Sequence, residues 1–133
     1  MLTLIQGATV YAPTFLGTQD VLIGGGKIIA IDENIILDSS VLVKRIDGKN
    51  KLVAPGFVDS LVHITGGGGE AGFASRTPEM NLTDATLSGT TTVVAALGTD
   101  SSSRTLTNLV AKAKGLKEQG LNVFCHTGSY HLP

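Results

Sequence analysis

From residue 56 onward, strand-like apolar runs alternate with helix-like segments, and this alternation restricts the fold more than any other feature of the sequence. The run at 90–97 is β-branched and continuously apolar, as is typical of a parallel strand covered on both faces. The expected strands cover residues 57–63, 90–97 and 121–125, with helices between them over 77–88 and 104–119. Alternation with short loops implies a parallel sheet with right-handed crossovers. The sequence therefore predicts an α/β fold with a βαβαβ segment in residues 55–133.

Local signals set the expected ends of both helices. Thr77 can cap the first helix, Pro78 suits its first position, and Glu79 favours the positive end of the helix dipole. Gly89 ends that helix. The serines at 101–103 offer N-caps for the second helix, whose apolar residues recur at helical spacing.

The first 54 residues read as a separate, small, sandwich-like β domain. Residues 20–23 and 27–31 flank Gly24–Gly26 and predict a β-hairpin, because glycine adopts positive φ readily. A phosphate-binding loop at these glycines is disfavoured, since no helix follows them. Two shorter runs, 2–5 and 8–11, predict two strands separated by Gln6-Gly7.

Composition excludes several classes of protein. The formal net charge is −1 and no long run of lysine or arginine occurs, so we expect no nucleic-acid binding. No apolar run approaches the roughly 20 residues that cross a bilayer, and the N-terminus has no signal-like pattern. The single cysteine, Cys125, excludes an intrachain disulfide framework and reads as a buried strand residue. A cytoplasmic location is therefore expected.

His63 ends the first barrel-like strand and is followed by a glycine-rich loop and Glu70. Side chains on a strand alternate between faces, so Asp59, Leu61 and His63 are expected to share one face. A histidine at position 61 would place two imidazoles about 6–7 Å apart, close enough to grip one metal ion. Leu61 stands there instead. By itself, His63 reads more readily as a hydrogen-bonded core histidine than as a metal ligand.

Two further polar residues follow predicted strands. Thr99 comes after the second strand and Tyr130 after the third. The C-terminal ends of parallel strands are where barrel enzymes hold their active sites. Taken singly, Glu70, Thr99 and Tyr130 would each read as ordinary loop residues.

Five short motifs occur in a fixed order, and together they carry a resemblance. They are Pro-Gly-Phe-Val-Asp, Gly-Gly-Gly-Gly-Glu, Arg-Thr-Pro-Glu, Leu-Gly-Thr-Asp and Thr-Gly-Ser-Tyr-His-Leu-Pro. The first is typical of the amidohydrolase superfamily, and the other four resemble the isoaspartyl (β-aspartyl) dipeptidase family. The similarity covers nearly the whole chain and corresponds to the N-terminal portion of that family.

The resemblance implies a (β/α)₈ TIM barrel with a small β domain, two zinc ions, and a metal-bound hydroxide that attacks the amide of a β-aspartyl dipeptide. It implies that His63 is a metal ligand and that Gly68 lies against the substrate. Glu70 would bind the free α-amino group, and Thr99 would contact the aspartyl end. Tyr130 would stabilise the oxyanion that develops on the carbonyl.

The sequence departs from the family in two respects. Leu61 offers no metal-binding atom, so we expect metal to be held at least about tenfold more weakly at this strand. The family's bridging lysine, later histidines, catalytic aspartate and carboxylate-binding arginines come from strands beyond residue 133, so the chain alone is expected to be inactive and its barrel incomplete. Exposed sheet edges favour a homo-oligomer or association with a missing remainder of the chain.

Two other functions stay open. The chain could be a degenerate or truncated, non-catalytic domain that serves as a binding or assembly module, with Leu61 as the mark of lost activity. Alternatively, it could belong to an amidohydrolase that opens a cyclic amide.

Overall fold

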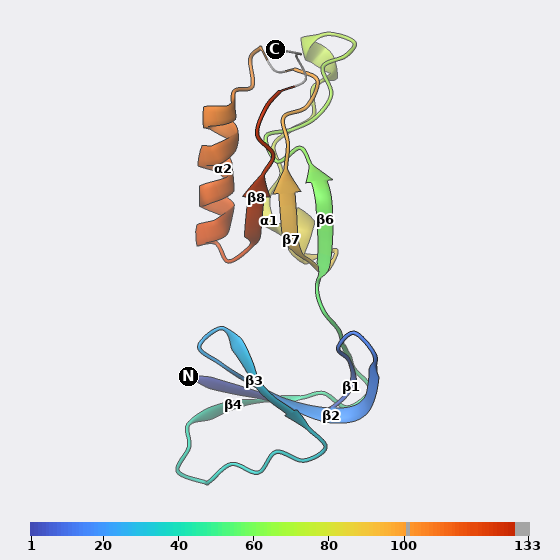
Figure 1. The fold of residues 1–133 in the computed structure, drawn as a ribbon, viewed down its shortest axis with the longest axis vertical. Helices are drawn as coiled ribbons and strands as arrows, with labels where there is room; N and C mark the ends of the chain where they lie inside the picture. Colours follow the sequence, from blue (N-terminus) through green and yellow to red (C-terminus); the bar gives the residue numbers. More distant parts are fainter. Residues whose placement is uncertain (101, 130–133) are drawn as a thin grey trace. The chain divides into compact units, whose positions relative to one another are not determined.

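The computed structural model describes residues 1–100 and 102–129. The chain divides into two compact units, Met1–Pro55 and Gly56–Pro133, and each contains its own β-sheet (Figure 1). The expected α/β class is confirmed, because the first sheet has no helix and the second alternates with helices. No helix within the described ranges is long and apolar enough to cross a membrane.

The N-terminal unit is one five-stranded sheet. Its strands are β1 (Leu2–Tyr11), β2 (Phe15–Gly24), β3 (Lys27–Asp32), β4 (Val43–Asp47) and β5 (Leu52–Val53). The order is β3-β2-β1-β4, and β5 also pairs with β1. Neighbours β1–β2 and β2–β3 are antiparallel, whereas β4 and β5 each run parallel to β1. The hairpin expected around Gly24–Gly26 joins β2 to β3.

The two strands expected on either side of Gln6-Gly7 are one strand, β1, with a shift of register between Ile5 and Ala8. Gly7 adopts φ 69° at this irregularity. Its amide N–H donates to a carboxylate oxygen of Asp20 at 2.8 Å, and the other oxygen accepts from Ile35 N–H at 3.1 Å. The buried carboxylate thus replaces the lost ladder bond, and the strand continues through the predicted break.

The C-terminal unit has the predicted βαβαβ order. Its elements are β6 (Phe57–Val62), a short 3₁₀ helix (Phe73–Ser75), α1 (Leu82–Thr86), β7 (Thr90–Ala95), α2 (Leu106–Glu118) and β8 (Asn122–Cys125). The sheet has the order β6-β7-β8, and both strand pairs are parallel. This confirms the parallel sheet inferred from the alternation of apolar runs.

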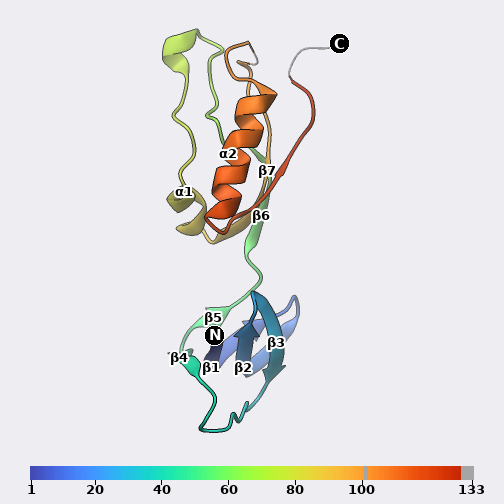
Figure 2. The ribbon, with the colours of Figure 1, turned by 90° about the vertical axis from the view of Figure 1, so that its left-hand side faces the viewer.

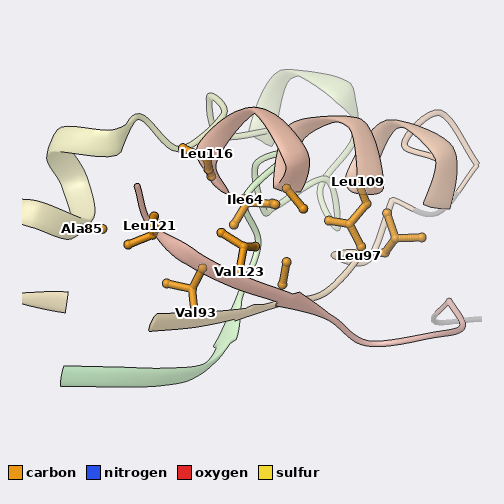
Figure 3. Close-up of a cluster of buried hydrophobic side chains, with 10 residues drawn as sticks. Ile64, Ala85, Val93, Leu97, Leu109, Leu116, Leu121 and Val123 are labelled. Carbon is orange, nitrogen blue, oxygen red and sulfur yellow. The ribbon is translucent and has the colours of Figure 1, made fainter. Parts of the chain in front are cut away.

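One hydrophobic core joins α2 to the sheet. Leu109, Ala113 and Leu116 recur on one face of α2 and are buried. They pack with Val93 of β7 and Val123 of β8, and Figure 3 shows α2 lying over these strands. Figure 2 shows the same helix in front of the sheet. Burial of this stripe is what fixes α2, since a helix of this length is marginal in isolation.

The expected start of the first helix is wrong. Instead of beginning at Thr77, α1 begins at Leu82, where Asn81 and Asp84 form a capping box. The hydroxyl of Thr77 accepts a hydrogen bond from Gly67 N–H at 2.7 Å, and Met80 N–H donates to the carbonyl of Ile64 at 3.0 Å. These long-range bonds hold the segment before Asn81 against the glycine loop. The cap of α2 also differs from expectation: it is Thr105, not a serine of 101–103.

Strand β6 differs from the buried strand that was expected. The side chains from Phe57 to Leu61 are exposed, and the register is irregular between Asp59 and Val62. Asp59 accepts a hydrogen bond from Leu61 N–H at 3.1 Å, and it lines a pocket with Ala85 of α1. Leu61 and His63 line one pocket, as expected of alternate residues on a strand, whereas Asp59 departs from the predicted shared face and lines a different pocket beside α1.

Candidate functional site

A pocket of about 460 Å³ lies at the C-terminal ends of the three parallel strands. Its wall includes His63 after β6, Thr99 after β7, and His126 after β8, together with Leu61 and Glu70. Three of the predicted site residues, His63, Glu70 and Thr99, are thus brought together. The ends of parallel strands meet at one edge of a sheet, and this is the usual position of a site in an α/β fold.

His63 is fixed by its neighbours rather than buried among them. Its Nδ1 lies 3.2 Å from the carbonyl oxygen of Ala96, an acceptor that favours a proton on Nδ1. Nε2 would then carry a free lone pair on an exposed ring. Gly67 and Gly98 pack beside the ring, where an added Cβ would lie 3.2 Å from Cδ2 and 3.7 Å from Cγ, respectively. The imidazole is therefore oriented as a ligand or proton acceptor requires.

His126 was not among the predicted site residues, yet it lies just after β8 and lines the pocket. Its amide N–H donates to Ala95 O at 2.8 Å, and its Nε2 lies 3.3 Å from Ser60 O. The signal that could have found it is the one used for Thr99, a polar residue directly following a parallel strand. Leu61 is 63% exposed and presents an alkyl group to the same pocket.

The absence of a side chain at Gly68 lets the loop pack against its own backbone. Gly68 adopts φ 69°, and an added Cβ would lie 2.3 Å from the carbonyl oxygen of Ser75. Its carbonyl accepts a hydrogen bond from Thr99 Oγ1 at 3.2 Å. The small residue at this position admits the loop's own backbone. The hydroxyl of Thr99 thereby links the loop after β6 to the segment after β7.

Arg104 was missed by sequence reasoning. Only 5% of it is exposed, and its Nη1 and Nη2 donate to the carbonyls of Gly67 and Thr77 at 2.9 and 3.0 Å. The N-terminal end of a helix dipole is positive, so a cation just before α2 is unfavourable. An arginine at this position was the one signal in the sequence that could have identified Arg104. A second arginine, Arg76, forms an ion pair with Asp100 at 3.3 Å.

Two acid–base groups near the site are perturbed. A hydrogen bond from the Ser103 hydroxyl, more than any other contact, lowers the pKa of Asp100, and the Ser103 amide and Arg76 act in the same direction. Burial raises the pKa of the Cys125 thiol, which disfavours a thiolate nucleophile. Asp100 therefore stays ionised as a structural anion, and Cys125 agrees with the packing role expected for it.

Tyr130, the predicted oxyanion-stabilising residue, lies outside the described residues. Among residues 1–100 and 102–129, no group of three or more His, Cys, Asp or Glu side chains is arranged to hold a metal ion. Leu61 contributes no donor, and the residues of this kind that line the pocket are His63, Glu70 and His126. The described residues alone do not fit a metal centre.

This chain resembles parts of known proteins in sequence and in fold. No family model matches the chain. Dihydroorotase from Ligilactobacillus salivarius (strain UCC118) is 44% identical over 63 residues, covering 47% of this chain and 15% of that protein. Dihydropyrimidinase from Brevibacillus agri NCHU1002 superposes with a TM-score of 0.69 at 23% identity, over 95% of this chain and 27% of that one. The latter is a likeness of fold alone.

Two solved structures of β-aspartyl dipeptidase from Fervidobacterium islandicum AW-1 match much more strongly. Both are 46% identical to this chain and cover all of it, with TM-scores of 0.92 and 0.91. The second holds the dipeptide β-Asp-Leu. This chain spans 36% and 35% of their lengths. The resemblance to isoaspartyl (β-aspartyl) dipeptidase is therefore confirmed over the whole chain, which matches these dipeptidases as a fragment of their larger fold.

Proposed function

We propose that this chain supplies part of an amidohydrolase that cleaves β-aspartyl dipeptides. The observation that carries the proposal is the pocket in which His63, Glu70 and Thr99 meet at the ends of three parallel strands. The 46% identity to a dipeptidase whose structure holds β-Asp-Leu supports this class of substrate.

Glu70 is the proposed anchor for the free α-amino group. It is exposed to the pocket, and a carboxylate facing an ammonium group forms a charge-assisted hydrogen bond. Gly68 would lie against the substrate in the same loop, and Thr99 would contact its aspartyl end. Tyr130 would donate a hydrogen bond to the scissile carbonyl and stabilise its developing negative charge.

We propose His63 as one ligand of a zinc ion, with its Nδ1–H held by Ala96 O and Nε2 available as the coordinating atom. Zinc would polarise the scissile carbonyl and lower the pKa of its bound water. The described residues lack the remaining ligands, and the 133-residue chain alone is expected to be inactive. Activity would then require association with further barrel strands. The single cysteine supports a cytoplasmic location.

Two observations each favour an alternative function. The 44% identity to dihydroorotase over 63 residues favours an amidohydrolase acting on a cyclic amide. Leu61, in the pocket wall, favours a non-catalytic relative that persists as a binding or assembly module.

A hybrid enzyme tests these functions. This chain would replace the matching portion of the F. islandicum dipeptidase, and hydrolysis of β-Asp-Leu, α-Asp-Leu and dihydroorotate would be compared. We expect hydrolysis of β-Asp-Leu alone. Glu70→Gln should lower kcat/KM by about 10- to 100-fold, the cost of one hydrogen bond to a charged group. Glu79→Gln, which removes an exposed carboxylate paired with Lys112, is the matched control and should be nearly silent.

The variant Leu61→His distinguishes an active amidohydrolase from a non-catalytic relative. In the hybrid, this change should raise zinc affinity at least about tenfold, measured by competition with a chelator. A correctly folded hybrid that is inactive with Leu61 and active with Leu61→His would support a non-catalytic role for the natural chain. Hydrolysis of dihydroorotate in place of β-Asp-Leu would support the cyclic-amide reading.

A further inference from the structure

Arg104 sits where two segments of the candidate site cross. Gly67 and Thr77 form two reciprocal hydrogen bonds: Thr77 N–H donates to Gly67 O at 2.9 Å, and Gly67 N–H donates to the side-chain Oγ1 of Thr77 at 2.7 Å. The guanidinium of Arg104 donates to the carbonyls of both residues, at 2.9 and 3.0 Å. One side chain thus bridges the two sides of the loop that carries Glu70.

The loop at Gly66 packs closely against Thr77 and the Arg104 guanidinium. An added Cβ on Gly66 would lie 2.3 Å from Thr77 O and 2.7 Å from Arg104 Nη2, so the loop closes directly onto the guanidinium. Among the described residues, the ion pairs are those of Arg76 with Asp100 and Lys112 with Glu79, and neither involves Arg104. A buried cation held by neutral carbonyls is costly unless its hydrogen bonds offset desolvation.

The same loop is tied to the segment after β7 at two further points. Thr99 donates to Gly68 O, and Arg76 pairs with Asp100. These two contacts lie at the exposed or half-buried surface, whereas Arg104 is 95% buried, since only 5% of it is exposed. The central constraint on the loop is therefore Arg104.

We propose that Arg104 is a positioning residue that sets the place of Gly68 and Glu70 in the pocket, and through them the affinity for the substrate's α-amino group. The link to the substrate rests on the proposed function. The clamp, meaning the hydrogen bonds from Arg104 to Gly67 O and Thr77 O, does not. Rigidly held binding groups lower the cost of ordering on ligand binding. Loosening the loop should therefore weaken substrate binding more than it slows the chemical step.

Hydrogen exchange of the 133-residue protein tests the clamp without any activity. Arg104→Met keeps much of the side-chain bulk and removes every donor, while Lys112→Met is the control on the same segment of chain. In Arg104→Met, exchange of the Gly67 and Thr77 amides should accelerate at least about tenfold, as loss of hydrogen bonds from a charged group predicts. Amides of β7 should be unchanged, and Lys112→Met should alter neither region.

The two outcomes that overturn the clamp are an unchanged rate at Gly67 and Thr77, and equal acceleration throughout the loop and β7. If Arg104→Met does not fold, Arg104→Lys, which retains one donor group, should give an intermediate acceleration confined to the loop. An unaltered loop in that variant would also overturn the clamp.

Kinetics of the hybrid enzyme test the link to substrate. Arg104→Met should raise KM for β-Asp-Leu at least about fivefold with kcat changed less than about twofold, since the loop contributes ground-state binding. Arg104→Lys should restore part of the lost affinity. A fall in kcat at constant KM would overturn the positioning role, whereas an inactive hybrid that retains Arg104 would contradict the proposed function and leave the exchange result to decide the clamp.

Discussion

Replacing Gly68 by alanine should damage the candidate site for a reason that can be separated from backbone strain. Gly68 adopts φ 69°, and Gly26 in the N-terminal hairpin adopts φ 73°. An alanine at either position enters the left-handed region at a cost of about 1–2 kcal/mol. The Cβ of Gly68→Ala would also lie 2.3 Å from Ser75 O, whereas that of Gly26→Ala would meet nothing within 4 Å.

The steric part of the cost follows from the short distance. Ordinary contacts of a Cβ begin at 3.4 Å, so the loop would have to move by about 1 Å to relieve the overlap at 2.3 Å. Backbone shifts that relieve overpacking cost about 1–3 kcal/mol. Gly68→Ala should therefore cost about 2–5 kcal/mol, and Gly26→Ala about 1–2 kcal/mol. A shift of that size would also lengthen the 3.2 Å bond from Thr99 to Gly68 O.

The assay is the free energy of opening of the slowest-exchanging amides in each unit, measured by hydrogen exchange, so that each variant is compared within its own unit. Gly68→Ala should lower it in the C-terminal unit, and Gly26→Ala should lower it less in the N-terminal unit. Equal costs for the two variants, within about 0.5 kcal/mol, would refute the claim that the loop is packed against Ser75.

Three other changes test the packing and the charges. Leu109→Ala should destabilise the C-terminal unit by about 2–5 kcal/mol in denaturant unfolding, because Leu109 is fully buried, whereas the exposed Val110→Ala should cost much less. Asp20→Ala should cost about 1–3 kcal/mol in the N-terminal unit, since two backbone N–H groups lose their acceptor. The lowered pKa of Asp100 means that its stabilising effect is complete above its ordinary value of 3.8 and is lost as the pH falls through the folded-state pKa. Asp100→Asn should therefore show a shallower loss of stability below pH 3.8 than the unchanged protein, and an identical acid limb would contradict the assignment.

The arrangement of strands and the longer helix could be predicted because their signals are local. Apolar runs bounded by glycine give β7 and β8, and the spacing of Leu109, Ala113 and Leu116 gives α2. The parallel sheet then follows from the order of elements, and with it the meeting of His63 and Thr99 at one edge.

What failed depends on contacts between distant residues. Thr77 and Pro78 carry good helix-start signals, yet Thr77 is held by Gly67 and Arg104, so α1 begins later. Asp59 captures the N–H of Leu61, and the alternation of faces along β6 breaks there. Neither event leaves a mark in the local pattern. The roles assigned to His63 and Glu70 stay predictions, because the structure gives their position but not their chemistry.

The pairing of β1 makes the order of synthesis matter. Its residue Leu2 lies opposite Val43 and its residue Val10 lies opposite Val53, so β1 leaves the ribosome well before the two strands that pair with it in parallel. Until then β1 can pair with β2, and β2 with β3. The other side of β1 keeps its backbone hydrogen-bonding groups unpaired. Slow translation before Val53 would prolong the interval in which the unpaired side of β1 can misfold.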